Sequence, residues 1–327
     1  MLNVAIVGCG LIGEKRAYAM REAASLKLCL DIDLSKATSF SKKFNCGIAT
    51  NFNEIISNKD IDIVVISTRH DSLYKFAIEA LESGKHVLIE KPGAKNYNQI
   101  KELDNAHKKN PTLKLHIGYN HRYHPSLLKA LEIYKSGDLG RILYLRGRYG
   151  HGGRLGYEKE WRANKDIAGG GELIDQGSHL IDISLAFIEG LELDYASTPT
   201  YFWDMEVEDN VFLILKNEQK NIAFLHASWT EWKNMFSFEI YGELGKIEIS
   251  GLGGSYGPEK LTHHQMLPNL GPPISKKWDF EQIDTSWELE FKEFTADILN
   301  NTNYSVNIES SKLILEIIEK SYEYSKI

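Results

Sequence analysis

Three ionisable side chains near the middle of the chain have the spacing of an acid–base site. Asp175, His179 and Asp182 lie at positions i, i+4 and i+7 of an expected long helix from about Gly171 to Phe187, so they share one face of it. A carboxylate one turn from an imidazole orients the ring and supports its protonated form, which suits general acid–base catalysis. The alternatives are a solvated polar face and a metal pair, although no cysteine or further histidine stands nearby at ligand spacing.

A second candidate for chemistry is Lys91, in the sequence Glu90-Lys91-Pro92 that follows an expected strand over Val87–Ile89. Open α/β sheets bind ligands at the carboxyl ends of their parallel strands. A lysine at that edge can donate to a substrate oxygen and stabilise negative charge that develops on it. The alternative is a solvated loop lysine.

Near the start, an apolar strand over Asn3–Val7 runs into the sequence Gly8-Cys9-Gly10-Leu11-Ile12-Gly13. A G-x-G-x-x-G pattern between a strand and a helix predicts a dinucleotide site, because it combines a tight turn, close backbone approach to a pyrophosphate and close helix packing. The helix N-terminus also favours phosphates.

Asp31 ends the next apolar run, 18 residues after Gly13. Its carboxylate can bind both ribose hydroxyls and repels a 2′-phosphate, which favours NAD over NADP. Asp33 competes for this role, and the alternative for such a carboxylate is a cap on the helix that Ser35 begins.

A cationic, glycine-rich stretch from Arg146 to Arg162 stands out in a chain of net charge −7. Arginines suit phosphates, and aromatic rings suit the faces of sugars or bases. Strand alternation places Tyr144, Arg146 and Arg148 on one face, which predicts an anionic, nucleotide-linked sugar as substrate. The alternatives are a charged surface loop and arginines that meet acidic residues across a subunit contact.

The composition restricts the partners. The 327 residues, 43% hydrophobic and 25% charged, suit two domains with substantial cores. The acidic net charge disfavours binding to nucleic acid or to an acidic membrane surface, and no apolar run approaches the ~18 residues of a membrane span. The first strand begins within three residues of Met1, which leaves no room for a signal peptide. Cys9, Cys29 and Cys46 lack metal or redox spacing, so a cytoplasmic location is expected.

These candidates need elements to position them, and strands alternate with helices over residues 1–120. This order predicts an α/β class fold with a doubly wound parallel sheet. Beyond residue 120 the pattern changes to several strands without helices between them, which predicts an α+β domain with a mainly antiparallel sheet over 121–327. Its expected strands are Arg141–Tyr149, Tyr195–Trp203, Val207–Leu215, Ile222–Trp229, Met235–Tyr241 and Lys246–Ser250.

Three further segments complete the expected second domain. A helix is expected around Leu127–Leu131, and two amphipathic helices near Glu288–Leu299 and Ile308–Tyr324 close the chain. The segment Gly251–Pro273 is rich in glycine and proline, so a long irregular loop is expected there.

Together, the glycine loop, Glu90-Lys91-Pro92 and the Gly169-Gly170-Gly171 run that leads to Asp175 and His179 resemble one family. This is the family of glucose–fructose oxidoreductase, inositol dehydrogenase and MocA-like oxidoreductases (Gfo/Idh/MocA), and the resemblance spans nearly the whole chain. It implies an NAD-dependent oxidoreductase acting on CH–OH groups. Its N-terminal domain would be a Rossmann domain and its C-terminal domain an open-sheet α+β domain for substrate binding and oligomerisation, in a homodimer or homotetramer.

The resemblance also implies roles for residues. Lys91, Asp175 and His179 match the catalytic residues, and a cis peptide is implied before Pro92. The implied cofactor-binding residues are Gly8, Gly10, Leu11, Ile12, Gly13, Asp31, Ser67, Thr68, His70, Glu90, Lys91, Asn120, Trp161 and Arg162. The implied substrate-binding residues are Lys91, Arg122, Tyr149, Arg154, Tyr157, Asp175 and His179, and no metal is implied.

The predicted reaction is hydride transfer from a secondary alcohol of a sugar, expected to be nucleotide-linked, to NAD. Alternatives are an inositol or free-sugar dehydrogenase, a non-catalytic NAD(H)-binding sensor and an NAD-assisted glycosidase. The run Gly150–His179, together with Gly251–Gly257, is similar to members of bacterial surface-polysaccharide pathways. The chain departs from many members at Thr68-Arg69-His70, where they have Thr-Pro.

Overall fold

The computed structural model describes residues 1–269, 271–280, 283–302 and 308–325. The chain forms two compact units, of which one comprises Met1–Asn120 with Trp287–Leu313 and the other His121–Ser286 with Ile314–Ile327. The sequence prediction gave all of 121–327 to the second domain. Helix α9 (Ser286–Asn300) instead packs mostly with the first unit, because its Phe291 and Phe294 are fully buried in that unit's hydrophobic core.

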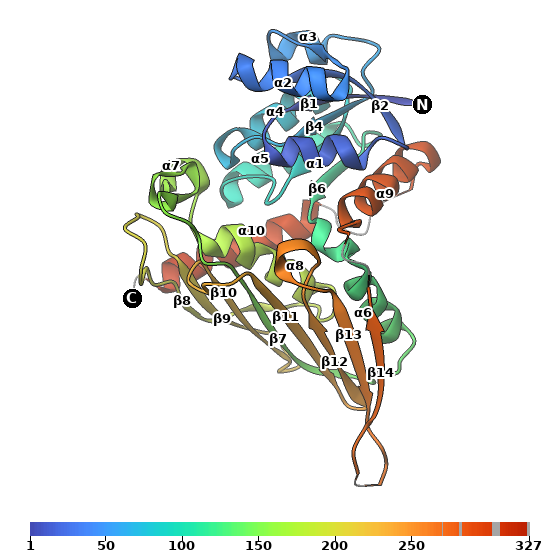
Figure 1. Ribbon diagram of the computed structural model, residues 1–327, viewed down its shortest axis with the longest axis vertical. Helices are drawn as coiled ribbons and strands as arrows, with labels where there is room; N and C mark the ends of the chain where they lie inside the picture. The colour runs from blue at the N-terminus through green and yellow to red at the C-terminus, as the bar shows by residue number, and fades with distance from the viewer. Residues whose placement is uncertain (270, 281–282, 303–307, 326–327) are drawn as a thin grey trace. The chain divides into compact units, whose positions relative to one another are not determined.

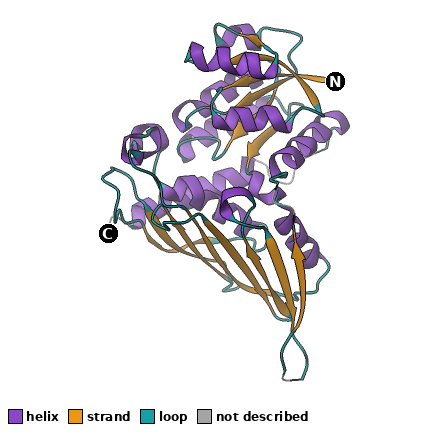
Figure 2. Cartoon of the chain, viewed as in Figure 1, coloured by secondary structure: helices purple, strands orange, loops and turns teal. Residues whose placement is uncertain are grey.

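The first unit is built on a six-stranded parallel sheet with the order β3-β2-β1-β4-β5-β6, flanked by helices (Figures 1 and 2). This is the predicted doubly wound sheet. Its strands are β1 (Leu2–Val7), β2 (Ala24–Leu30), β3 (Gly47–Ile48), β4 (Ile63–Ile66), β5 (His86–Glu90) and β6 (Leu115–Gly118). Its helices within 1–120 are α1 (Leu11–Ala19), α2 (Leu34–Phe44), α3 (Phe52–Ile56), α4 (His70–Glu82) and α5 (Tyr97–Lys109).

The register of this sheet brings three candidate segments to one edge. Val7, Ile66 and Ile89 are paired across β1, β4 and β5. The segments that follow them begin with Gly8, Ser67 and Glu90, so the glycine loop and the Glu90-Lys91-Pro92 turn leave the same carboxyl edge. The strand order reverses between β1 and β4, which is where sheets of this kind bind ligands.

The second unit contains an eight-stranded sheet with the order β14-β13-β12-β11-β7-β10-β9-β8. Every pair is antiparallel except β7 with β10, so the sheet is mainly antiparallel, as predicted. Figure 1 shows α6 (Pro125–Lys135) and α8 (Ser178–Leu185) on one face of this sheet. Its strands are β7 (Ile142–Gly150), β8 (Glu192–Ser197), β9 (Asn210–Lys216), β10 (Ile222–Ser228), β11 (Met235–Gly242), β12 (Gly245–Ser250), β13 (Lys260–Gln265) and β14 (Ile274–Asp279).

Two expectations for this unit were wrong. The segment expected to be a long loop contains strand β13, whose buried Leu261 and His263 alternate with more exposed neighbours and pair with β12. The strand expected to reach Trp203 ends at Ser197, because the backbone N–H groups of 201–203 donate to the Asp209 carboxylate rather than to a neighbouring strand.

The two closing helices were predicted correctly, as α9 and α10 (Ile308–Tyr324). In the part of the chain that is described, no helix is both long and apolar enough to cross a membrane.

Candidate active site

The predicted acid–base helix begins at a glycine run that is clamped by a buried glutamate. Glu208 is buried, and its Oε1 accepts hydrogen bonds from the backbone N–H groups of Gly171 and Leu173, both at 3.0 Å. Its own carbonyl accepts from Glu172 N at 3.0 Å. A Cβ on Gly171 would lie 2.0 Å from that carbonyl oxygen, so only glycine fits this close approach. Glu208 was not predicted as a site residue, because a glutamate 37 residues along the chain gives no local signal.

The expected long helix is in fact interrupted. Leu173–Gly177 forms a π-helical turn that contains Asp175, and α8 with His179 follows directly. Such single π turns within helices occur frequently at functional sites. His179 is 5% exposed, and the side chain of Asp175 is 19% exposed. The two groups therefore sit in a partly closed environment with restricted access to water.

Asp175 pairs with a residue that was predicted to bind the cofactor. The Nε of Arg162 lies 3.3 Å from Oδ2 of Asp175, and the guanidinium also lies 4.6 Å from the ring centre of Trp161. Burial lowers the pKa of Arg162, but Asp175, Tyr157 and Glu160 together outweigh it, so the pKa is raised. The pair keeps a positive charge beside Asp175, which favours its carboxylate form.

His179 contacts a cluster of buried rings. Its imidazole stacks on that of His121, with ring centres 3.7 Å apart and planes 21° apart. The Nε2 of His121 lies 3.0 Å from the hydroxyl of Tyr149, and the ring of Phe236 packs against Tyr149 at 5.5 Å. His121 was not predicted as a site residue, although its neighbours Asn120 and Arg122 were.

Asp182 has a structural partner instead of a place beside Asp175 and His179. It is fully buried, and its carboxylate accepts from Arg122 Nε at 2.8 Å and Arg122 Nη2 at 2.7 Å. The same Nη2 also donates to the Asp182 carbonyl at 3.0 Å. Burial raises the pKa of Asp182, and the Arg122 guanidinium opposes that rise. The guanidinium that was predicted to bind substrate is thus bonded to this helix.

The glycine loop has the backbone geometry that a dinucleotide requires. Gly8 has φ +100°, and a Cβ there would lie 2.5 Å from the Ser67 carbonyl oxygen. A Cβ on Gly13 would lie 2.0 Å from the Gly8 carbonyl oxygen, which reflects close packing of α1. Gly10, by contrast, has no heavy atom within 4 Å of its Cβ position, and it caps α1 without a side-chain bond. These three environments match the turn, the open approach and the helix contact of a pyrophosphate site.

The structure separates the two aspartates that competed for the ribose role. Asp31 directly follows β2, and its Oδ2 accepts from the backbone N–H of Cys9, inside the glycine loop, at 2.8 Å. Asp33 instead caps α2, because its Oδ1 accepts from Ser35 N at 2.9 Å and from Lys36 N at 3.4 Å. Asp31 is therefore the carboxylate held next to the glycine loop.

The Glu90-Lys91-Pro92 turn is anchored by a buried ion-pair cluster. Arg16 of α1 is fully buried, and its Nη2 lies 2.5 Å from Glu90 Oε1. Its Nη1 pairs with the fully buried Glu290 of α9. The Lys91–Pro92 peptide is cis, as the resemblance implied. Arg16 therefore fixes the residue that precedes Lys91, while the Glu90 carboxylate that was predicted to bind cofactor is bonded within the first unit.

The remaining predicted residues lie in several environments. Ser67 donates to the Gly8 carbonyl at 3.0 Å, and Thr68 accepts from Ser72 at 2.9 Å. Arg154 pairs with Glu160 at 2.5 Å. Leu11 is exposed at the start of α1, and Ile12 lies beside it. His70 and Asn120 are buried. Tyr157 packs with Trp203 and Trp229 in a buried aromatic cluster.

The cationic stretch does not form one anion-binding face. Gly147 and Tyr149 are buried on the helix side of β7, because a Cβ on Gly147 would meet Leu180 of α8 at 3.1 Å. Arg146 and Arg148 alternate with them and are exposed on the opposite face, where they pair with Glu239 and Glu231. The five arginines in this stretch and its flanks each have an acidic partner, namely Arg141, Arg146, Arg148, Arg154 and Arg162.

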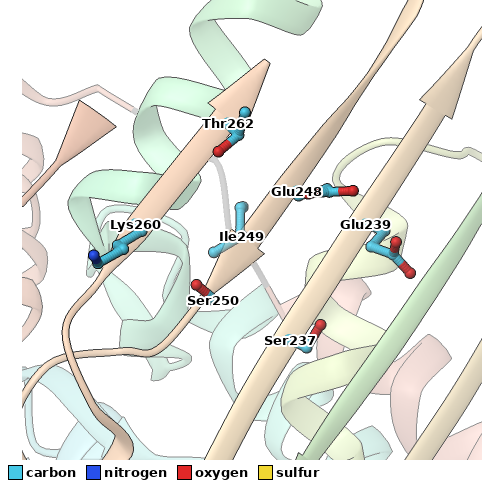
Figure 3. Close-up of a pocket in the computed structure, with 7 residues that line it drawn as sticks. All are labelled: Ser237, Glu239, Glu248, Ile249, Ser250, Lys260 and Thr262. Carbon is cyan, nitrogen blue, oxygen red and sulfur yellow. The ribbon is translucent and has the colours of Figure 1, made fainter. Parts of the chain in front are cut away.

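A pocket on this sheet is separate from the acid–base cluster. A cavity of about 350 Å³ lies over β11, β12 and β13, and Figure 3 shows the side chains that line it. Its Glu239 and Lys260 already form ion pairs with Arg146 and Asp279. Along β11, Glu239 alternates with the buried Phe236 and Phe238, so the pocket opens on the face opposite the ring cluster of His179. Its lining residues are Ser237, Glu239, Glu248, Ile249, Ser250, Lys260 and Thr262.

Among the described residues, no group of three or more metal-ligating side chains is present.

Two family models match the chain. One is described as an oxidoreductase family with an NAD-binding Rossmann fold and matches residues 2–119. The other is described as the GFO/IDH/MocA C-terminal domain and matches residues 127–248.

Individual proteins are similar as well. Levoglucosan dehydrogenase of Pseudarthrobacter phenanthrenivorans is 31% identical over 284 residues, which are 75% of this chain and 73% of that protein. D-glucoside 3-dehydrogenase of Escherichia coli K12 is 30% identical over 189 residues, which are 55% of this chain and 50% of that protein. A solved structure of levoglucosan dehydrogenase, in complex with NADH and levoglucosan, has a TM-score of 0.90 at 21% identity and covers 99% of this chain and 97% of that one.

Proposed function

Because the chain belongs to the Gfo/Idh/MocA family of NAD-dependent oxidoreductases, we propose that it is a sugar dehydrogenase that oxidises a secondary alcohol of an uncharged sugar or glycoside. The observation that supports this most is the presence in one chain of two chemical groups. One is Lys91 at the carboxyl edge of a Rossmann sheet, and the other is Asp175 in a π-helical turn that is followed directly by His179 in α8.

In this mechanism each side chain has a separate task. His179 takes the hydroxyl proton of the substrate, and Asp175 stabilises the imidazolium that forms. Lys91 donates to the same oxygen and stabilises its alkoxide character. When bound, NAD would supply the acceptor for the hydride of the alcohol carbon. In the reverse direction His179 returns the proton and Lys91 polarises the ketone.

The cofactor is assigned to the glycine loop of the first unit. The open backbone at Gly10 suits the pyrophosphate, and Asp31, held by Cys9 N, suits the adenosine ribose. Trp161 and Arg162 are further candidates for cofactor contacts, and Arg162 would then exchange its bond with Asp175 for one with the cofactor.

The substrate proposal departs from the nucleotide-linked sugar that the cationic stretch predicted. Arg146 and Arg148 point away from the His179 side of the sheet, and the arginines of this stretch are neutralised by acids. Two similar proteins are named levoglucosan dehydrogenase and D-glucoside 3-dehydrogenase. Neither name mentions a phosphate or a nucleotide. A nucleotide-linked sugar, and with it a role in surface-polysaccharide synthesis, is the second candidate.

We also propose self-association through the exposed face of the second sheet. Tyr144, Arg146 and Phe224 are all more than a third exposed there, on strands at the centre of the sheet. Light scattering coupled to gel filtration tests this directly, and a monomer at micromolar concentration would contradict it.

The function is tested with a substrate panel that contains anhydrosugars, glycosides, free sugars, inositols and nucleotide-linked sugars, read by NADH absorbance at low and high salt. We expect turnover of an uncharged sugar with little salt dependence, and loss of turnover in His179→Ala with NADH binding retained. A nucleotide-linked substrate would show turnover that weakens as salt rises, because exposed charge pairs are screened.

Other outcomes identify the remaining alternatives. Released sugar without net NADH identifies an NAD-assisted glycosidase, and NADH binding without any turnover identifies a sensor. Near-wild-type turnover in His179→Ala overturns the proposed mechanism.

A further inference from the structure

Polar groups on the buried rings around His179 contact one another in series. Gln176 Nε2 donates to the Tyr256 hydroxyl at 2.9 Å. The hydroxyls of Tyr256 and Tyr149 interact in turn, and Tyr149 meets His121 Nε2 at 3.0 Å. One assignment of the protons that fits these contacts has Tyr256 donating to Tyr149 and Tyr149 donating to His121 Nε2.

This direction decides where the proton of His121 resides. A hydroxyl that donates to Nε2 requires that nitrogen to be unprotonated, which places the single proton of a neutral imidazole on Nδ1. Burial raises the pKa of Tyr149 well above its ordinary value and raises that of Tyr256 to about 12, so both hydroxyls keep their protons at neutral pH. In this assignment His121 is neutral, and its ring lies 3.7 Å from the imidazole of His179.

A neutral His121 matters because of that stacking distance. In oxidation His179 must gain a proton, and a second cation 3.7 Å away would oppose this. The stack also fixes the plane of the His179 ring, whose terminal torsion is otherwise only weakly defined. Both effects depend on the bond between Tyr149 and His121.

We propose that Tyr149 and His121 are positioning residues, in which the Tyr149 hydroxyl holds His121 neutral and the stacked His121 ring keeps His179 oriented and able to accept a proton. This rests on the proposed acid–base role of His179. Neither residue needs to touch the substrate for this role.

Several other titratable groups face this cluster. His124 lies 5.4 Å from the His121 ring and is itself bonded to the buried Glu259. The negative charges of Asp175 and Glu172, which lie in or next to the π-helical turn, raise the pKa of both Tyr149 and Tyr256. No variant below changes His124, Glu259, Asp175 or Glu172. Their influence on the pH profile is therefore common to all variants.

The first test measures kcat/KM for oxidation against pH at saturating NAD, in wild type, Tyr149→Phe, His121→Phe and the double variant. Loss of the Tyr149 hydroxyl lets His121 take a proton more easily, and a proton on either ring blocks the reaction. The acidic limb of Tyr149→Phe should therefore move to higher pH. In the double variant no second imidazole remains, so the limb should return to the position seen in His121→Phe.

The same cycle separates positioning from direct substrate contact. If Tyr149 acts only through His121, Tyr149→Phe lowers kcat in the wild-type background and has no further effect in His121→Phe. An equal loss in both backgrounds, or an unmoved acidic limb, overturns the proposal. His121→Gln replaces His121→Phe if the latter does not fold. His226→Phe and Tyr241→Phe, on the opposite face of the sheet, are matched controls and should leave the profile unchanged.

A second measurement does not depend on turnover. NMR titration of the enzyme labelled with ¹⁵N-histidine should show His121 titrating at higher pH in Tyr149→Phe than in wild type. If it does not, the inference fails even where the proposed function stands. If His179→Ala keeps full turnover, the proposed function fails, and the NMR result still decides whether Tyr149 holds His121 neutral.

Discussion

Gly171→Ala tests whether the glycine run positions the acid–base pair. The glycine has no positive φ, so an alanine there meets a purely steric obstacle. Its Cβ would lie 2.0 Å from the Glu208 carbonyl oxygen and 3.0 Å from the Glu208 backbone N and C atoms. An ordinary contact begins at 3.4 Å, so the backbone must move by more than 1 Å.

The size of the effect follows from what that movement breaks. Glu208 holds this segment through bonds to Gly171 N, Leu173 N and Glu172 N, each at 3.0 Å. Overpacking with loss of one such bond costs about 2–4 kcal/mol. A unit of this size then loses roughly 5–15 °C in Tm. Because Asp175 lies one turn further on, a misplacement of this kind lowers kcat by about 10²-fold.

Gly177→Ala is the matched control in the same helical segment. There a Cβ meets the Leu173 Cδ1 atom at 3.2 Å and the Glu172 carbonyl at 3.4 Å, so a flexible side chain can give way. We expect a nearly unchanged Tm and kcat. Differential scanning fluorimetry and steady-state kinetics measure both quantities. Wild-type values in Gly171→Ala, or equal losses in the two variants, would refute the steric reasoning.

Three further predictions concern single carboxylates. Asp182→Asn should lower stability by about 3–5 kcal/mol, because it leaves the Arg122 charge without its buried partner, and a variant with unchanged Tm but raised KM would instead indicate that Arg122 binds substrate. For Glu208, burial raises the pKa above its ordinary value of 4.5, so the protonated form is favoured in the native state. The stability that this group contributes is therefore present below pH 4.5 and is lost as the pH rises through the raised pKa. Glu208→Gln should therefore remove this part of the pH dependence of Tm, whereas Glu208→Ala should be destabilised at every pH. Asp31→Ser should relax the preference for NAD over NADP in kcat/KM, and a wild type that prefers NADP tenfold would contradict that role.

Local patterns in the sequence were enough to predict the first unit and the catalytic candidates. The glycine loop, the strand–turn motif at Lys91 and the spacing of Asp175 and His179 are each contained within a dozen residues. Short-range motifs of this kind report backbone geometry directly, because glycine spacing and strand ends determine which conformations fit. The roles of these residues in catalysis remain predictions.

What the sequence did not reveal depends on contacts between distant residues. Glu208 clamps Gly171 from 37 positions away, and Glu290 reaches Arg16 from 274 positions away. Helix α9 has an ordinary amphipathic pattern, which cannot indicate that its Phe291 packs in the first unit rather than the second. The hidden strand β13 is flanked by glycine and proline, so composition pointed to a loop while its alternating Leu261 and His263 carried the weaker strand signal.

The arginine-rich strand shows what alternation alone leaves undecided about the substrate. Alternation correctly placed Arg146 and Arg148 on one face of β7, but it does not say which face looks toward the chemistry. Gly147 decides this. With no side chain, it leaves space for Leu180 of α8, and a Cβ there would also meet Leu225 and Phe238 at 3.0 Å. The helix that carries His179 can approach β7 closely only on this side, which puts Tyr149 next to His121 and leaves the arginines on the other face. A slip of one residue in the pairing of β7 would bring Arg148 into the position of Tyr149 and place an unneutralised cation beside His179.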